Sequence, residues 1–247
     1  MVASGCFSNA PVLNASSGVG HVINVGGVNS YVTGSPLAVL AILLVSDVYG
    51  IQQSSSLPII GVCVLIIQFN VYVISFLCLN SLFCLSVLLS SSNFTRSICF
   101  AGFKAPLLRK IADKVADNGY YVLVPDFLHG DPYDPKNVSR PTRVWLKDHE
   151  PGKSSEEAKS IIEALKRKNV SAVGVAGFCW GAKTVTNLAK TELIQASVLL
   201  HPSYIVVNDI RGVNVPIAIL GAEHDSLSPP KLVKEFEEVL KAKPQVP

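Results

Sequence analysis

Charge is almost absent from one long stretch of this sequence. No Asp, Glu, Lys or Arg occurs in the 48 residues from Val48 to Thr95, and block 51–102 carries a single charge, Arg96. Over all 247 residues the charged share is 16%, against a usual share of about a quarter. Because hydrophobic residues make up 49%, the composition still excludes a disordered chain, a coiled coil and a collagen-like repeat.

Several other signals are missing, and each absence excludes a class of protein. The six cysteines are too few for a disulfide scaffold and form no CxxC pair, so no metal site is expected. A net charge of +3 predicts no nucleic-acid partner, and no dinucleotide fingerprint or other cofactor motif is present. The first residues lack a basic run followed by an apolar one, which predicts a cytoplasmic protein.

Apolar runs and amphipathic patterns alternate along the rest of the chain. This alternation predicts an α/β fold, with a mostly parallel sheet and helices on both faces. Strands are expected at 22–25, 30–32, 37–46, 120–124, 172–176, 196–200 and 217–220, helices at 104–118, 155–168, 181–190 and 231–240, and a proline-rich loop at 126–153.

The most informative turn is Gly177-Phe178-Cys179-Trp180-Gly181, between an expected strand and an expected helix. Small residues on both sides of Cys179 suit a strained turn that lifts a nucleophile above the strand ends. A sulfur at a helix N-terminus favours the thiolate, and the N–H of Trp180 is expected to donate to an oxyanion. The simpler interpretation is a buried cysteine in a glycine-rich turn.

A second candidate is Asp225, just past the last expected strand and 46 residues after Cys179. The order of nucleophile and then acid is that of α/β-hydrolases, although an ordinary Asx turn before a helix is the alternative interpretation. His224 is a poor partner for Asp225, because neighbouring residues in an extended loop point apart.

Four segments carry a resemblance to a known family: LLVSDVYG (43–50), APLLRKIADKVADNGYYVLVPDFLHGDPY (105–133), GFCWGAK (177–183) and GAEHDSLSPP (221–230). They resemble the dienelactone hydrolase (carboxymethylenebutenolidase) family, in particular plant members, some of which are described as β-glucanases. The resemblance implies an α/β-hydrolase-like fold, interrupted by block 51–102. It implies hydrolysis of an ester or lactone, with Cys179 as nucleophile and Asp225 as acid. It also implies that Asp47 lies near the nucleophile and that the N–H of Val48 is the second oxyanion donor. No carboxylate pair of a β-glucanase is visible.

The sequence departs from the family where the catalytic histidine is expected, because no histidine follows Asp225. We therefore expect a chain truncated at its C-terminus, with impaired hydrolase activity. A catalytically silent or membrane-tethered binding protein that retains the pocket is the alternative. Further candidates for lining the pocket are His129, Arg140 and His201, with His201 also a candidate substitute base. The preferred alternatives are a structural role for His129 in its loop and a solvated loop charge for Arg140.

Block 51–102 separates two parts of one expected hydrolase domain, 1–50 and 103–247. Leu, Ser, Phe, Ile, Cys and Val, all with uracil-rich codons, supply 39 of its 52 residues, and Lys, Glu, Asp and Met are absent. We interpret it as translated intron. There are two alternatives: a transmembrane segment at 57–89 and a lid over the site. A membrane is an expected partner only if 57–89 is a transmembrane segment.

Overall fold

The computed structural model describes residues 16–48, 85–88 and 103–243. Apart from the strand at 85–88, block 51–102 lies outside the described residues. The intron, membrane and lid interpretations all concern this part of the chain. Within the described ranges, no helix combines the length and the apolar character needed to cross a membrane.

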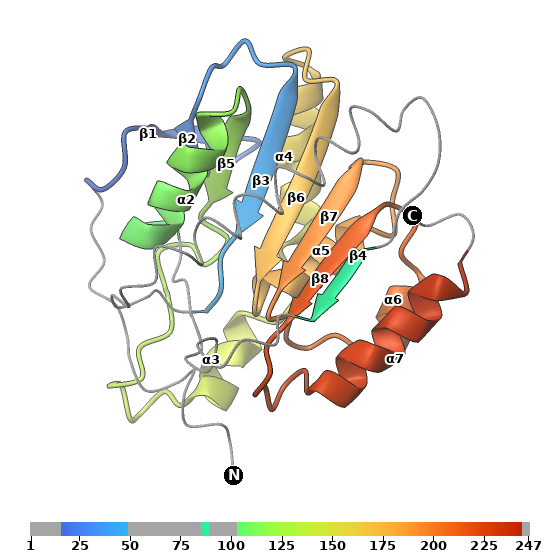
Figure 1. The fold of residues 1–247 in the computed structure, drawn as a ribbon. Coiled ribbons are helices and arrows are strands. Elements are labelled where there is room, and N and C mark those ends of the chain that lie inside the picture. Colours follow the sequence, from blue (N-terminus) through green and yellow to red (C-terminus); the bar gives the residue numbers. More distant parts are fainter. Residues whose placement is uncertain (1–15, 49–84, 89–102, 244–247) are drawn as a thin grey trace.

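Strands and helices alternate as expected (Figure 1). The strands are β1 (His21–Val25), β2 (Val28–Thr33), β3 (Leu40–Val45), β4 (Leu85–Leu88), β5 (Tyr121–Pro125), β6 (Ala172–Phe178), β7 (Ala196–Leu200) and β8 (Ile217–Gly221). The helices are α2 (Pro106–Ala116), α3 (Thr142–Asp148), α4 (Ser155–Lys166), α5 (Gly181–Leu188), α6 (Val207–Arg211) and α7 (Pro230–Lys241).

One mixed sheet runs through the molecule in the order β1-β2-β5-β3-β6-β7-β8-β4. β1 and β2 form a hairpin, and β2 also pairs antiparallel with β5. Every other pair of neighbouring strands is parallel. The predicted α/β-hydrolase fold, mostly parallel with helices on both faces, is therefore confirmed. The carboxyl ends of β3, β6, β7 and β8 meet at one edge, where the candidate site lies.

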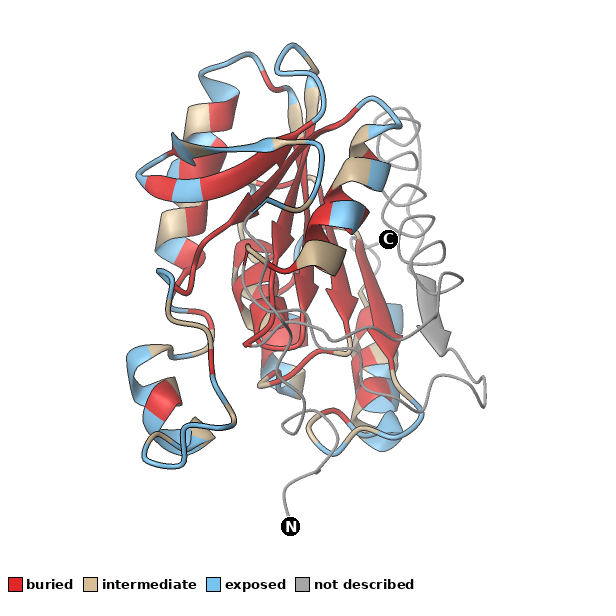
Figure 2. Ribbon diagram, turned by 90° about the vertical axis from the view of Figure 1, so that its left-hand side faces the viewer, coloured by how far each residue is buried: buried red, intermediate tan, exposed pale blue. Residues whose placement is uncertain are grey.

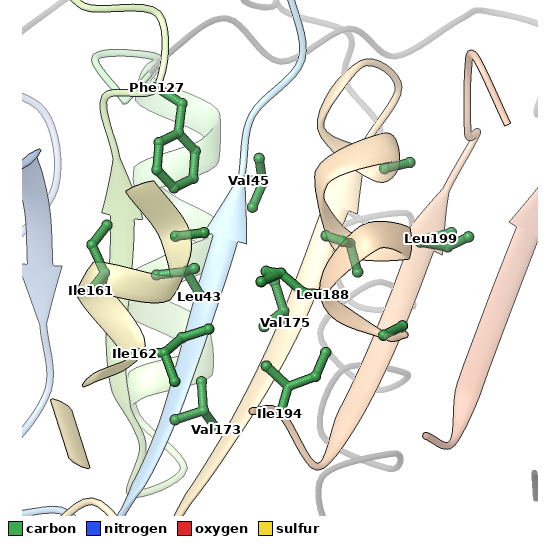
Figure 3. Close-up of a cluster of buried hydrophobic side chains, with 14 of the residues drawn as sticks. Leu43, Val45, Phe127, Ile161, Ile162, Val173, Val175, Leu188, Ile194 and Leu199 are labelled. Carbon is green, nitrogen blue, oxygen red and sulfur yellow. The ribbon is translucent and has the colours of Figure 1, made fainter. Parts of the chain in front are cut away.

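Side chains of the central strands alternate between two apolar layers, because successive residues of a strand point to opposite faces. Leu43 and Val45 of β3 pack in the layer that also holds α4 and α5, and Figure 3 shows them facing Ile161, Ile162 and Leu188. Ile42 and Leu44 point to the other face, toward α2. The central strands are buried on both faces (Figure 2), which explains their nearly continuous apolar sequences.

The expected loop 126–153 contains a helix, α3, and this part of the prediction was wrong. Its prolines flank the helix and do not interrupt it: Pro141 occupies the extended position just before Thr142. A single buried residue, Trp145, holds α3 against the core. α6 was also not predicted. It is one short turn, capped by Asp209, whose side chain accepts the N–H of Val206 at 3.0 Å.

Candidate active site

Cys179 occupies a strained turn between β6 and α5. Its φ is 49°, in the left-handed region that a residue with a side chain rarely adopts. Three hydrogen bonds hold this conformation: the N–H of Cys179 donates to the carbonyl of Leu200 at 3.0 Å, and its own carbonyl accepts the N–H groups of Ala182 and Ser203, each at 3.1 Å. The structure therefore places Cys179 at the strained strand-to-helix turn that the sequence predicts.

Two glycines make this turn possible because their neighbours leave no room for a Cβ. A Cβ at Gly177 would lie 2.6 Å from Val185 Cγ2, and one at Gly181 would lie 2.6 Å from the carbonyl oxygen of Val45. Strand β3 and helix α5 thus approach each other so closely that only glycine fits at position 181. The G-x-C-x-G spacing of the sequence follows from this packing.

The sulfur of Cys179 contacts a residue that the sequence analysis did not single out. Sγ lies 3.2 Å from the hydroxyl oxygen of Ser203, three residues beyond the end of β7. Both side chains are buried, with exposed fractions of 4% for Cys179 and 2% for Ser203. A cysteine motif alone reveals no such partner, since the contact depends on the pairing of β6 with β7.

On one side of Cys179, the segment 131–149 contacts both predicted oxyanion donors; we call this the loop side. The indole Nε1–H of Trp180 donates to the carbonyl of His149 at 2.9 Å. The carbonyl of Val48 accepts the N–H of Tyr133 at 2.9 Å. Trp180 and Val48 are both buried. Two hydrogen bonds thus tie the indole of Trp180 and the carbonyl of Val48 to one segment of the chain.

The segment 131–149 is itself cross-linked. Trp145 donates its Nε1–H to the carbonyl of Asp131 at 3.0 Å and stacks on His149 with ring centroids 4.1 Å apart. The guanidinium of Arg140 binds the carboxylate of Asp131 at 2.8 Å and that of Asp148 at 2.7 Å. Hydrogen bonds to Asp131 and Asp148 raise the pKa of Arg140 above its ordinary value. Arg140 therefore joins the two ends of the loop.

Asp225, His201 and Ser228 lie beyond the carboxyl ends of β7 and β8, and we call this group the acid side. The carboxylate oxygen Oδ1 of Asp225 accepts the N–H groups of Leu227 at 2.8 Å and Ser228 at 3.0 Å, so the Asx turn that the sequence left as an alternative is present. This turn holds the carboxylate just beyond β8, beside the carboxyl end of β7.

His201 directly follows β7, and its N–H donates to the carbonyl of Leu220 at 2.8 Å. Its ring atom Nε2 and the hydroxyl of Ser228 are buried without a hydrogen-bond partner among the described residues. Burial lowers the pKa of His201 to about 4, although the nearby Asp225 carboxylate opposes part of this effect. The imidazole is therefore neutral at pH 7.

Comparison with known proteins assigns the chain to a family. The sequence model described as the dienelactone hydrolase family matches residues 100–246, more than half of the chain. The chain belongs to the dienelactone hydrolase family. Two solved structures share its fold: a dienelactone hydrolase-like promiscuous phosphotriesterase from metagenomic libraries, and TT1662 from Thermus thermophilus. Each has a TM-score of 0.52. The phosphotriesterase is 14% identical, and the match covers 90% of this chain and 76% of that structure. TT1662 is 15% identical, and the match covers 92% of this chain and 84% of that structure.

Curated relatives of this dienelactone hydrolase family member carry different names. An endo-1,3;1,4-beta-D-glucanase of Zea mays is 45% identical over 146 residues, which are 59% of this chain and 47% of the maize protein. A carboxymethylenebutenolidase homolog of Homo sapiens is 33% identical over 143 residues, which are 57% of this chain and 58% of the human protein. The chain thus spans about half the length of the curated relatives it matches.

Not all predicted residues of this dienelactone hydrolase family member come together. Asp47 is fully buried directly after β3, at the same sheet edge as Cys179, and lies with Val48 outside the residues matched by the family model. His129 lies on the surface, where its Nε2 is 3.2 Å from the carboxylate of Glu157, at the start of α4. His224, expected to be a poor partner for Asp225, is exposed.

Proposed function

We propose that this chain cleaves small-molecule esters or lactones, with Cys179 as the nucleophile. The observation that carries the proposal is the left-handed conformation of Cys179 at the β6–α5 turn, because backbone strain of this kind persists where surrounding contacts maintain it for function. Membership of the dienelactone hydrolase family supports the same reaction. The substrate class is proposed from the family, since an ester and a lactone present the same reactive carbonyl.

In the first step, the thiolate of Cys179 attacks the carbonyl carbon and forms an S–C bond. Negative charge then develops on the carbonyl oxygen, and the N–H groups of Trp180 and Val48 stabilise it. When the C–O bond to the alcohol breaks, the acyl group stays on Cys179 as a thioester. The loop side supports this step, because its hydrogen bonds to the Trp180 indole and the Val48 carbonyl restrain the two residues that supply the donors.

Release of the acyl group needs a base that activates water. Within these 247 residues no histidine follows Asp225, and the imidazole that interacts electrostatically with Asp225 is that of His201. A base with a pKa of about 4 is weak at neutral pH, where general bases work best with a pKa close to the ambient pH. We therefore propose that the 247-residue chain acylates once and then releases the acyl group slowly.

The test is a burst experiment with p-nitrophenyl acetate. The expected result is close to one equivalent of p-nitrophenol per chain, with acetyl found on Cys179 by peptide mass spectrometry, followed by slow turnover. Cys179→Ala should abolish the burst. A folded chain that releases no p-nitrophenol contradicts the proposal and favours the non-catalytic binding protein. Fast multiple turnover abolished by Cys179→Ala overturns the slow-release step and points to His201 as the base.

Three repaired chains extend the same test. One lacks residues 51–102, the second carries a family-like, histidine-bearing segment after Pro247, and the third has both changes. We expect only a chain with both changes to turn over quickly, because the first restores the connection after Gly50 and the second supplies the base. Deletion of 51–102 alone should leave a single burst. Fast turnover after the deletion alone contradicts the need for an added base.

The proposed reactive thiol favours a reducing compartment, and we propose the cytosol. Fractionation of cells that express the 247-residue chain tests this proposal. The chain should appear in the cytosolic fraction. Recovery in carbonate-resistant membranes, with aggregation excluded, contradicts the proposal and favours insertion of block 51–102.

A further inference from the structure

We propose that Ser203 is a positioning residue for Cys179: its hydroxyl donates a hydrogen bond to Sγ and thereby stabilises and orients the thiolate. This inference rests on the proposed function, in which Cys179 is the nucleophile. Ser203 does not react with the substrate. It acts through the sulfur of Cys179, which it contacts from the end of the neighbouring strand.

Two separate contacts join Ser203 to residue 179. The N–H of Ser203 donates to the carbonyl of Cys179 at 3.1 Å, and its hydroxyl oxygen lies 3.2 Å from Sγ. The first contact belongs to the main chain and is independent of the side chain. It therefore holds the Cβ of residue 203 beside Cys179 even in a variant without the hydroxyl. Removing the hydroxyl isolates its own effect.

The chain reaches this geometry through unusual backbone conformations. His201 and Tyr204, on either side of Ser203, have φ values of 38° and 63°. Cys179, at 49°, faces them across the pair β6–β7. Three residues other than glycine thus adopt the left-handed backbone region in the two segments that follow β6 and β7. Strain concentrated in this way is typical of sites where the surrounding structure fixes a functional group.

The chemistry assigns the direction of the hydrogen bond in the reactive state. A thiolate only accepts, whereas a serine hydroxyl can donate, so the Ser203 proton points to Sγ when Cys179 is ionised. A donor to the charged form favours that form, and bonds to ionised groups are stronger than bonds between neutral groups. The N-terminus of α5 acts in the same sense on the thiolate.

During acyl transfer Ser203 keeps its proton. Sγ supplies the electron pair for the new S–C bond, and the C–O bond of the ester breaks as the alkoxide or phenolate departs. The neutral thioester sulfur is a weaker acceptor than the thiolate. The Ser203 hydroxyl therefore stabilises the attacking state more than the acylated state, and its benefit is confined to the ionisation and orientation of Cys179.

Another buried serine of the same segment provides a matched control. Ser197, in β7, is fully buried, and its hydroxyl donates to the carbonyl of Pro216 at 3.1 Å. It lies at the opposite end of the strand from Cys179. Ser197→Ala and Ser203→Ala thus each remove one buried hydroxyl and one hydrogen bond, and only Ser203→Ala affects the contact to sulfur.

The experiment is the pH dependence of Cys179 alkylation by iodoacetamide in the full chain, with folding of each variant checked by circular dichroism. Because the chain has six cysteines, the modified residue is quantified by mass spectrometry on the tryptic peptide between Lys168 and Lys183, in which Cys179 is the only cysteine. In Ser203→Ala the midpoint of the profile should rise by about one pH unit, the size expected for loss of a charge-assisted hydrogen bond. In Ser197→Ala the midpoint should stay at the wild-type value. In Ser203→Thr, which keeps a hydroxyl at this position, the midpoint should lie close to the wild-type value.

An unchanged midpoint in folded Ser203→Ala overturns the inference, and so does an equal shift in Ser197→Ala, which would be a general effect of destabilisation. The burst with p-nitrophenyl acetate, measured on the same samples, separates this inference from the proposed function. A shifted alkylation midpoint without any acetylation of wild-type Cys179 rejects the hydrolase proposal and retains Ser203 as the partner of the thiol. Acetylation of all variants with one common pH profile retains the hydrolase and rejects the role of Ser203.

Discussion

The loop side and the acid side of Cys179 differ in how completely their polar groups are paired. On the loop side, Trp145, Trp180 and Arg140 all donate hydrogen bonds to the segment 131–149. On the acid side, His201 Nε2 and the hydroxyl of Ser228 are buried without partners among the described residues. Unpaired buried polar atoms cost stability and are concentrated at functional sites. The loop side is therefore built to hold backbone donors still, and the acid side keeps groups that can accept a further polar partner.

Trp145→Ala should produce the largest effect, because this variant removes the central ring of the loop side. Trp145 is 1% exposed and packs on His149 and against the edge of Tyr133. Replacing a buried Trp by Ala should lower the free energy of unfolding by about 4 kcal/mol and slow acylation of Cys179. Urea unfolding gives the first quantity and the p-nitrophenol burst the second.

The control is Trp145→Phe, which keeps an aromatic ring at this position but loses part of the indole and the Nε1–H that donates to Asp131. It should cost about 2 kcal/mol, less than Trp145→Ala, because one buried hydrogen bond and only part of the ring packing are lost. If Trp145→Ala unfolds at the same urea concentration as wild type, α3 does not stabilise the loop side and the contrast between the two sides fails.

His201→Gln tests the acid side through the pH dependence of stability. Burial holds the pKa of His201 at about 4 in the folded chain, below the value of 6.5 for an exposed imidazole. As the pH falls through 6.5, the unfolded chain binds a proton that the folded chain does not, so His201 makes folding less favourable by about 2 kcal/mol between pH 7 and pH 5. The free energy of unfolding of His201→Gln should therefore fall by about 2 kcal/mol less than that of the wild type between pH 7 and pH 5.

Urea unfolding at pH 7 and pH 5 measures the difference for each chain. Ser228→Ala is the matched control, because it removes a neighbouring buried polar atom that does not titrate in this range; it should keep the wild-type pH dependence. Equal losses of stability in wild type and His201→Gln on going to pH 5 would show that the folded chain binds the proton at His201 after all.

Arg140→Met should have the smallest effect, although Arg140 makes two ion pairs on the loop side. Its side chain and both carboxylates are partly exposed, and such pairs contribute little because water and salt screen them. The rate of the p-nitrophenol burst should change by at most about twofold. A selective loss of activity toward anionic esters, with neutral esters unaffected, would instead place Arg140 against the substrate.

The order of the elements and the position of Cys179 could be predicted because they depend on local patterns. Buried strands such as Leu40–Val45 appear as continuous apolar runs, and the turn at Cys179 is visible in the sequence as glycine at positions 177 and 181. The short helix α3 was missed because its stability comes from a single buried ring, that of Trp145, and a periodic pattern needs several such positions.

The partners of the candidate site residues could not be predicted, because they come from segments far apart in the chain. Ser203 reaches Cys179 through the register of β6 and β7, and Tyr133 reaches Val48 across 85 residues of sequence. The buried Nε2 of His201, which has no hydrogen-bond partner among the described residues, likewise depends on what surrounds it in space. Spacing along the sequence was sufficient for the nucleophile turn, since the close approach of α5 to its neighbouring strands leaves glycine at fixed positions on either side of Cys179. Hydrogen-bond partners, burial and the resulting pKa of His201 were decided by tertiary packing, because each depends on atoms that adjacent residues do not supply.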